Sequence, residues 1–204
     1  QTHKDLFGQV LVALVTPMTP EGEVDWPATE KHLDYVISNG ADGVVVTGTT
    51  GETSTLTDAE KLQLVKVGKS VSAGRAKIIT GGGSNETAHA IQLYKASEAA
   101  GADGVMIVTP YYNKPTQAGV LTHFRMIADA TDLPVILYDI PGRAGIPINF
   151  ETILRAAKHP NIVAVKDAKG DFAQASRVMN ETDLLYFSGD DGNVLPHLSI
   201  GATG

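Results

Sequence analysis

The chain has 204 residues, of which 43% are hydrophobic, 19% charged and 6% aromatic, as in an ordinary soluble globular domain. Its formal net charge of −7, without any basic cluster, argues against a nucleic-acid-binding surface, and no apolar run is long enough to span a membrane. Cysteine is absent, which excludes disulfides and thiolate chemistry and fits a cytoplasmic location.

Short apolar runs rich in Val and Ile recur along the chain, and each is apolar on both faces. Continuous rather than alternating hydrophobicity predicts parallel strands that are covered on both sides. The predicted strands are Val10–Val15, Val44–Thr47, Lys77–Thr80, Val105–Val108, Val135–Tyr138, Ile162–Lys166 and Leu184–Ser188.

The longer segments between these runs have helical patterns. One helix is expected after Trp26, with Pro27 at its first position. Another begins at the capping-box pattern from Thr57 to Glu60, and a third runs from Asn85 to Ala100. Strands that alternate with helices indicate a series of βαβ units.

A repeated phrase marks where helices end and strands begin. Gly40-Ala41-Asp42-Gly43 recurs at residues 101–104, and a weaker copy at residues 201–204 ends the chain. The third copy predicts an eighth strand from about Gly204. We therefore expect one domain over residues 1–204, an α/β (β/α)8 (TIM) barrel truncated before its eighth strand. The alternative is an open doubly wound sheet, although no G-x-G-x-x-G follows the first strand.

Lys166 is the most informative candidate residue, because it stands at the carboxyl end of the sixth predicted strand. Burial there would lower the pKa of the amine, and a neutral amine can attack a ketone to form a Schiff base. The simpler interpretation, a lysine at the edge of the core with its charge in water, is open from this segment alone.

Polar residues also follow the other predicted strands, at the end where barrel enzymes have their active sites. The loop Gly48-Thr49-Thr50-Gly51 offers backbone N–H groups and hydroxyls to an anion, but a plain tight turn is an equal alternative. Tyr138 could be simple packing, and Arg143 either a surface charge or a bidentate carboxylate ligand. The six histidines have no metal-ligand spacing, so neither a metal nor a cofactor is predicted.

Four motifs together resemble the dihydrodipicolinate synthase family, within the pyruvate-dependent Schiff-base aldolases. The resemblance covers the whole chain, and the arginine loop distinguishes the synthases from relatives that act on sugar acids. The motifs are Gly48-Thr49-Thr50-Gly51-Glu52, Thr109-Pro110-Tyr111-Tyr112-Asn113, Tyr138-Asp139-Ile140-Pro141-Gly142-Arg143 and Lys166-Asp167-Ala168-Lys169-Gly170.

This resemblance implies a lyase of lysine and diaminopimelate biosynthesis that needs no cofactor. Lys166 would form the Schiff base with pyruvate, and the resulting enamine would attack L-aspartate-4-semialdehyde to give 4-hydroxy-tetrahydrodipicolinate. Tyr138, Thr49 and Tyr112 would relay protons, with Tyr112 reaching the site of a neighbouring subunit. The expected assembly is therefore a homo-oligomer, at least a dimer and by expectation a tetramer.

The resemblance also assigns the substrate contacts. Thr50 would hold the pyruvate carboxylate, Arg143 the carboxylate of the semialdehyde, and Gly189 would approach the ligand through its backbone. Family members continue beyond the eighth strand with a C-terminal helical domain. The alternative function is a related aldolase that acts on a sugar acid.

One pocket departs from the family pattern. Some members are inhibited by lysine at a dimer-interface site that includes two histidines and a glutamate. Here Asp58 and Lys61 replace the histidines and His89 replaces the glutamate. We therefore expect weak inhibition by lysine or none.

Overall fold

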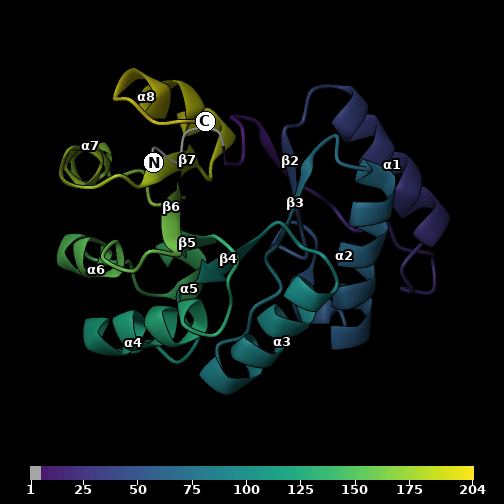
Figure 1. Cartoon of the computed structure of the whole chain (residues 1–204), viewed down its shortest axis with the longest axis horizontal. Coiled ribbons are helices and arrows are strands. Elements are labelled where there is room, and N and C mark those ends of the chain that lie inside the picture. The colour runs from purple at the N-terminus through teal and green to yellow at the C-terminus, as the bar shows by residue number, and fades with distance from the viewer. Residues whose placement is uncertain (1–5) are drawn as a thin grey trace.

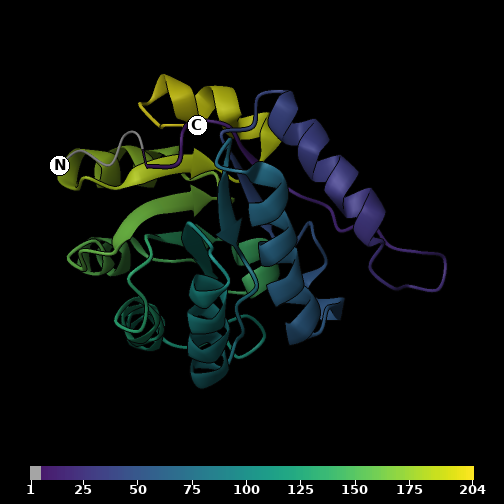
Figure 2. The same ribbon diagram turned by 45° about the vertical axis from the view of Figure 1, so that its right-hand side comes forward.

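The computed structural model describes residues 6–204, so residues 1–5 of the predicted domain lie outside the described part (Figure 1). Its core is one sheet of seven parallel strands in sequential order, and helices cover the outer face of the curled sheet (Figures 1 and 2). The strands are β1 (Leu11–Ala13), β2 (Gly43–Val46), β3 (Lys77–Thr80), β4 (Gly104–Val108), β5 (Val135–Asp139), β6 (Ile162–Asp167) and β7 (Leu185–Ser188).

The predicted strands are all present, and most of their ends differ by one or two residues. β1 differs most from its prediction. It is only three residues long and its residues are half-buried, whereas the sequence predicted a strand covered on both faces. No ladder joins β1 to β7, so β1 pairs along one edge only, with β2. Seven parallel strands in sequential order and wrapped by helices confirm the barrel class and exclude the open doubly wound sheet.

The helices follow from the local signals in the sequence. Asp25 caps α1 through the backbone N–H of Ala28, and Pro27 lies one residue inside the helix rather than at its first position. The capping box of Thr57 and Glu60 at α2 is confirmed in both directions. The helices are α1 (Trp26–Ser38), α2 (Asp58–Ser72), α3 (Thr87–Ala99), α4 (Gln117–Ala128), α5 (Pro141–Ala144), α6 (Phe150–Ala156), α7 (Phe172–Glu181) and α8 (Val194–Ser199).

All three copies of the repeated phrase begin with a left-handed glycine after a helix. The φ angles are 104° at Gly40, 95° at Gly101 and 101° at Gly201. Within the third copy, Thr203 N donates to Tyr186 O, and Gly204 O accepts from Ser188 N. The last two residues therefore run beside β7, where the eighth strand was expected to begin.

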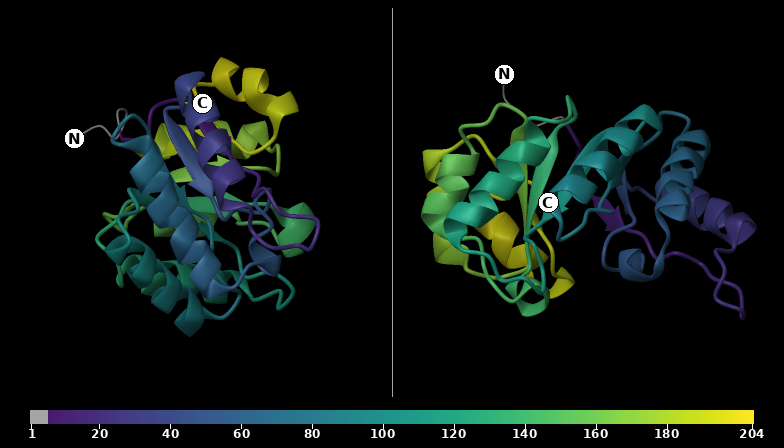
Figure 3. Two further views of the ribbon diagram at one scale, coloured as in Figure 1. Left: turned by 90° about the vertical axis from the view of Figure 1, so that its right-hand side faces the viewer. Right: turned by 90° about the horizontal axis from the view of Figure 1, so that it is seen from below.

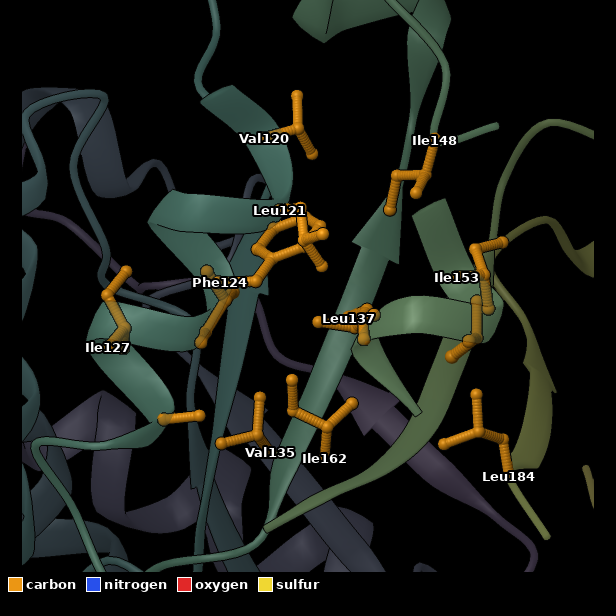
Figure 4. Packing of buried hydrophobic residues seen from close by; sticks show 14 of the residues in the cluster. Val120, Leu121, Phe124, Ile127, Val135, Leu137, Ile148, Ile153, Ile162 and Leu184 are labelled. Atoms are coloured by element: carbon orange, nitrogen blue, oxygen red, sulfur yellow. The ribbon is translucent and has the colours of Figure 1, made fainter. Parts of the chain in front are cut away.

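Two hydrophobic layers fix which way the strand side chains point. The outer layer packs α4 and α6 against the sheet, with Phe124 and Leu137 fully buried (Figure 4). The inner layer fills the barrel and includes Ile136, Tyr138 and Ala164. Because side chains alternate along a strand, this packing directs Tyr138 and Lys166 into the barrel.

In the view from below, helices lie on the outside of the molecule, on both sides of the strands (Figure 3). Within residues 6–204, no helix has the length and apolar character needed to cross a membrane.

Candidate active site

The centre of the site is a lysine and a tyrosine on adjacent strands. Tyr138 of β5 and Lys166 of β6 are register partners, and Lys166 Nζ lies 4.4 Å from the centroid of the Tyr138 ring. Tyr138 is 5% exposed and Lys166 is half-buried. The sequence prediction that these two residues meet at the strand ends agrees with this geometry.

The surroundings of Lys166 favour its neutral amine. Burial lowers the pKa of Lys166 below its usual range, and the nearby Asp191 carboxylate opposes this by favouring the ammonium. Burial is the larger of the two effects. A depressed pKa increases the fraction of amine that is able to act as a nucleophile.

An open cavity of about 780 Å³ lies between β1 and β7, and four of the predicted site residues are on its wall. It extends from the strand ends to β1 and to the α8 segment. The predicted residues on its wall are Thr50, Tyr138, Lys166 and Gly189.

A second cavity of about 200 Å³ also has Tyr138 on its wall and contains Arg143. Thr49, Tyr138 and Arg143 line it, with Tyr111 nearby on the same wall. Burial raises the pKa of Tyr138, while the Thr49 side chain and the Arg143 guanidinium lower it. Tyr138 therefore borders both the cavity that contains Lys166 and the one that contains Arg143.

Close backbone packing shapes the loop that carries Thr49 and Thr50. A Cβ at Gly51 would lie 2.9 Å from Leu14 O, and one at Gly81 would lie 3.0 Å from Gly48 Cα. Thr47 precedes the loop at a φ of 58°, which is strained for a β-branched residue. These constraints hold the two threonines at the mouth of the barrel.

Tyr112 is the one predicted site residue that does not join the others in this chain. Its side chain is 90% exposed, its φ is 69°, and it lines neither cavity. The adjacent Asn113 is fixed through hydrogen bonds with Asn85, at 3.1 Å in each direction. The loop thus presents an aromatic side chain outward.

Sequence reasoning missed two polar groups in the site. Asp191 lines the cavity of Lys166, yet nothing in the sequence indicated a partner for it. Thr53 lines the cavity of Arg143, and within residues 6–204 its buried hydroxyl has no hydrogen-bond partner. Among the same residues, no cluster of three or more His, Asp or Glu side chains is arranged to hold a metal ion.

The fold and site define a (β/α)8-barrel protein with a half-buried lysine and a buried tyrosine at the carboxyl ends of two adjacent strands. Residues 6–204 match the model of the dihydrodipicolinate synthetase family, and the chain belongs to that family.

Relatives and solved structures agree with this assignment. The chain is 53% identical over 97% of its length to a 4-hydroxy-tetrahydrodipicolinate synthase of Acidothermus cellulolyticus, covering 64% of that protein. It is 51% identical over its full length to the synthase of Corynebacterium aurimucosum, covering 68% of it. The chain thus spans about two thirds of the length of these relatives.

Two crystal structures are similar over nearly the whole chain. The dihydrodipicolinate synthase of Cyanidioschyzon merolae with lysine bound has 47% identity and a TM-score of 0.95, over 98% of this chain and 69% of that one. The enzyme of Acinetobacter baumannii complexed with pyruvate has 42% identity and a TM-score of 0.94, over 97% and 69%.

Proposed function

We propose that this protein is a 4-hydroxy-tetrahydrodipicolinate synthase, a lyase that condenses pyruvate with L-aspartate-4-semialdehyde. The observation that carries the proposal is the half-buried Lys166 amine beside Tyr138, with a pKa lowered by burial. Relatives at about half identity that carry this name support the choice of substrates.

The reaction begins when the neutral Lys166 amine attacks the pyruvate ketone. The carbinolamine loses water to give a protonated imine, which is the electron sink for removal of a methyl proton. The enamine that results forms a carbon–carbon bond with the semialdehyde. The amino group of the semialdehyde then displaces Lys166 as the product cyclises.

Protons move through Tyr138, which is the group next to the lysine nitrogen. Thr49 interacts with Tyr138 and continues the path. The outward side chain of Tyr112 completes the relay in a second copy of the chain, so that a homodimer is the smallest active unit and a tetramer its expected assembly. The exposure and strained backbone of Tyr112 support this role.

The two substrates carry one carboxylate each, and the proposed carboxylate contacts lie on the walls of different cavities. Thr50 and the backbone of its loop bind the pyruvate carboxylate in the larger cavity, where Gly189 also faces the ligand. Arg143 binds the carboxylate of the semialdehyde in the smaller one. Tyr138 borders both and lies where the new bond forms.

Reductive trapping tests the proposal. Borohydride with pyruvate should attach one reduced pyruvyl group to the full chain, and peptide mapping should locate it at Lys166. The Lys166→Ala variant should lose both the label and turnover, whereas Lys158→Ala, in the turn that precedes the same strand, should keep both. A label that persists in Lys166→Ala would assign the nucleophile to another lysine.

The alternative, an aldolase that cleaves a sugar acid, uses the same imine and differs only in the aldehyde. Its relatives generally lack an arginine in the Arg143 loop. Incubation of the protein with candidate sugar acids should release no pyruvate, while pyruvate plus semialdehyde should be consumed together. Release of pyruvate from a sugar acid at a comparable rate would favour the alternative.

A further inference from the structure

Two buried carboxylates stand behind the catalytic pair. Asp139 and Asp167 follow Tyr138 and Lys166 directly and are register partners in turn. Because strand side chains alternate, they point to the outer side of the barrel wall. They are 1% and 4% exposed, so each needs hydrogen-bond or ion-pair partners.

Lys169 compensates the first carboxylate. Its Nζ lies 3.3 Å from Asp139 Oδ2 and donates to Ile148 O at 3.3 Å. Asp139 Oδ1 accepts from the backbone N–H of Ile148 at 3.0 Å. This pair ties the end of β5 to the segment after β6.

His197 faces the second carboxylate from α8. Its side chain is completely buried, and Nε2 lies 3.3 Å from Asp167 Oδ2. The other oxygen, Oδ1, accepts from the backbone N–H groups of Lys169 at 2.7 Å and Gly170 at 3.0 Å. The His197 ring packs edge-to-face with the ring of Phe172, with 4.9 Å between the ring centroids.

The hydrogen-bond partners of His197 determine where its protons are. Nδ1 lies 2.9 Å from Asn193 O, which can only accept, so Nδ1 carries a hydrogen. Nε2 faces a carboxylate oxygen, so a proton must lie between them as well. Two backbone donors on Oδ1 stabilise the charged carboxylate, which places that proton on Nε2. The ring is then an imidazolium that faces the Asp167 carboxylate.

The pair connects the two parts of the proposed site. Asp167 is adjacent to Lys166, and Asp167 O accepts from Gly189 N at 2.8 Å. His197 follows the turn Asp191–Asn193, and the Asp191 carboxylate of this turn acts on the charge of Lys166. We propose that His197 is a positioning residue, whose ion pair with Asp167 fastens the segment bearing Gly189 and Asp191 to the end of the strand bearing Lys166. The proposal rests on the proposed Schiff-base function.

The protonation state can be measured independently of activity. In protein labelled with ¹⁵N-histidine at neutral pH, the His197 ring should show two protonated nitrogens, and the His197→Gln spectrum assigns its signals. A neutral ring with one unprotonated nitrogen would overturn the ion pair. This measurement stands even if pyruvate trapping fails and the proposed function with it.

Variants test the positioning role. His197→Phe keeps the ring and its contact with Phe172 but removes both hydrogen bonds. We expect it to raise the pyruvate concentration for half-maximal trapping about tenfold, in line with the loss of a charge-assisted hydrogen bond. His197→Gln keeps an N–H that can reach Asp167, so its increase should be smaller than that of His197→Phe.

A matched control is available at the opposite end of the barrel. His159 Nε2 pairs with Asp129 Oδ1 at 2.9 Å, away from both cavities of the site. His159→Phe should leave the pyruvate dependence unchanged. A normal pyruvate dependence in His197→Phe, or an equal increase in His159→Phe, would overturn the positioning role. If His197→Phe does not fold, the comparison of His197→Gln with His159→Gln decides the question in the same way.

Discussion

Lys166 and Tyr138 are register partners on adjacent parallel strands, and the lysine Nζ lies 4.4 Å from the centroid of the tyrosine ring. This single relationship explains two properties of the site. The ring shields the amine from water on one side, which contributes to the burial that lowers its pKa. It also keeps a phenol within reach of any imine that forms on Lys166.

Tyr138→Phe should separate these two properties. The variant keeps the ring, so imine formation with pyruvate should persist. Turnover should fall by about 10²–10⁴-fold, the usual contribution of a positioned acid or base. Steady-state rates and borohydride trapping on the same preparation give both values. Turnover within threefold of the unmodified protein would remove Tyr138 from the proton relay.

Arg143→Ala should affect one substrate selectively. A charge-assisted hydrogen bond to a carboxylate contributes about 1.5–3 kcal/mol, so the KM for the semialdehyde should rise by about 10–150-fold. The KM for pyruvate should change little, because Thr50 and Lys166 lie in the other cavity. Arg143→Lys keeps the charge without the bidentate geometry, so its KM for the semialdehyde should lie between those of the unmodified protein and Arg143→Ala. Equal changes in both KM values would argue against a specific role.

Most of the fold could be predicted because it depends on local and repetitive signals. Apolar runs identified all seven strands, and the capping box located the start of α2. The weakest prediction was β1, since its burial depends on which strands lie beside it rather than on its own residues. Pairing partners of that kind are set by tertiary structure, which a run of apolar residues does not encode.

The site was predictable only in part. Lys166 and Tyr138 could be placed because strand ends converge at one edge of a barrel, whereas Gly189 was assigned only by the family resemblance. Asp191 and His197 could not, because their partners come from strands and helices far away in sequence. The orientation of Tyr112 depends on a positive φ angle, for which its sequence gives no signal, since it is not a glycine.

His123 should make the stability of the protein depend on pH. Its side chain is 4% exposed, and burial lowers its pKa from 6.5 to about 4. The unfolded chain therefore binds more protons between these two values, so stability is lost as the pH falls from 6.5 toward 4. The loss should reach about 3 kcal/mol at most, since one pKa unit corresponds to about 1.4 kcal/mol.

Denaturant unfolding at several pH values measures this effect. His123→Asn should remove the contribution of His123 to the change of unfolding free energy with pH between pH 6.5 and 4, whatever its effect on overall stability. His159→Asn replaces a histidine that has a carboxylate partner, and this variant should keep the contribution of His123 to the pH dependence. An unchanged slope in His123→Asn would assign the acid sensitivity to other groups.

The last prediction concerns L-lysine, which should inhibit this protein weakly or not at all. In the pocket that the family resemblance identifies, Asp58 is already occupied. Its Oδ2 lies 2.7 Å from His89 Nε2, and Lys61 Nζ lies 3.6 Å from Oδ1. Thr57 and Glu60 cap the helix, so Asp58 is available for these contacts. A lysine ammonium would have to displace His89 and approach the charge of Lys61.

A titration of L-lysine at fixed pyruvate tests this expectation. Inhibition should be slight throughout the submillimolar range, because the side chains of the pocket satisfy one another. Replacing them with the family pattern, by Asp58→His, Lys61→His and His89→Glu together, should remove the internal pair and restore a carboxylate for the effector. That triple variant should be inhibited at lower lysine concentrations than the unmodified protein. Half-inhibition of the unmodified protein at submillimolar lysine would show that the occupied pocket still admits the effector.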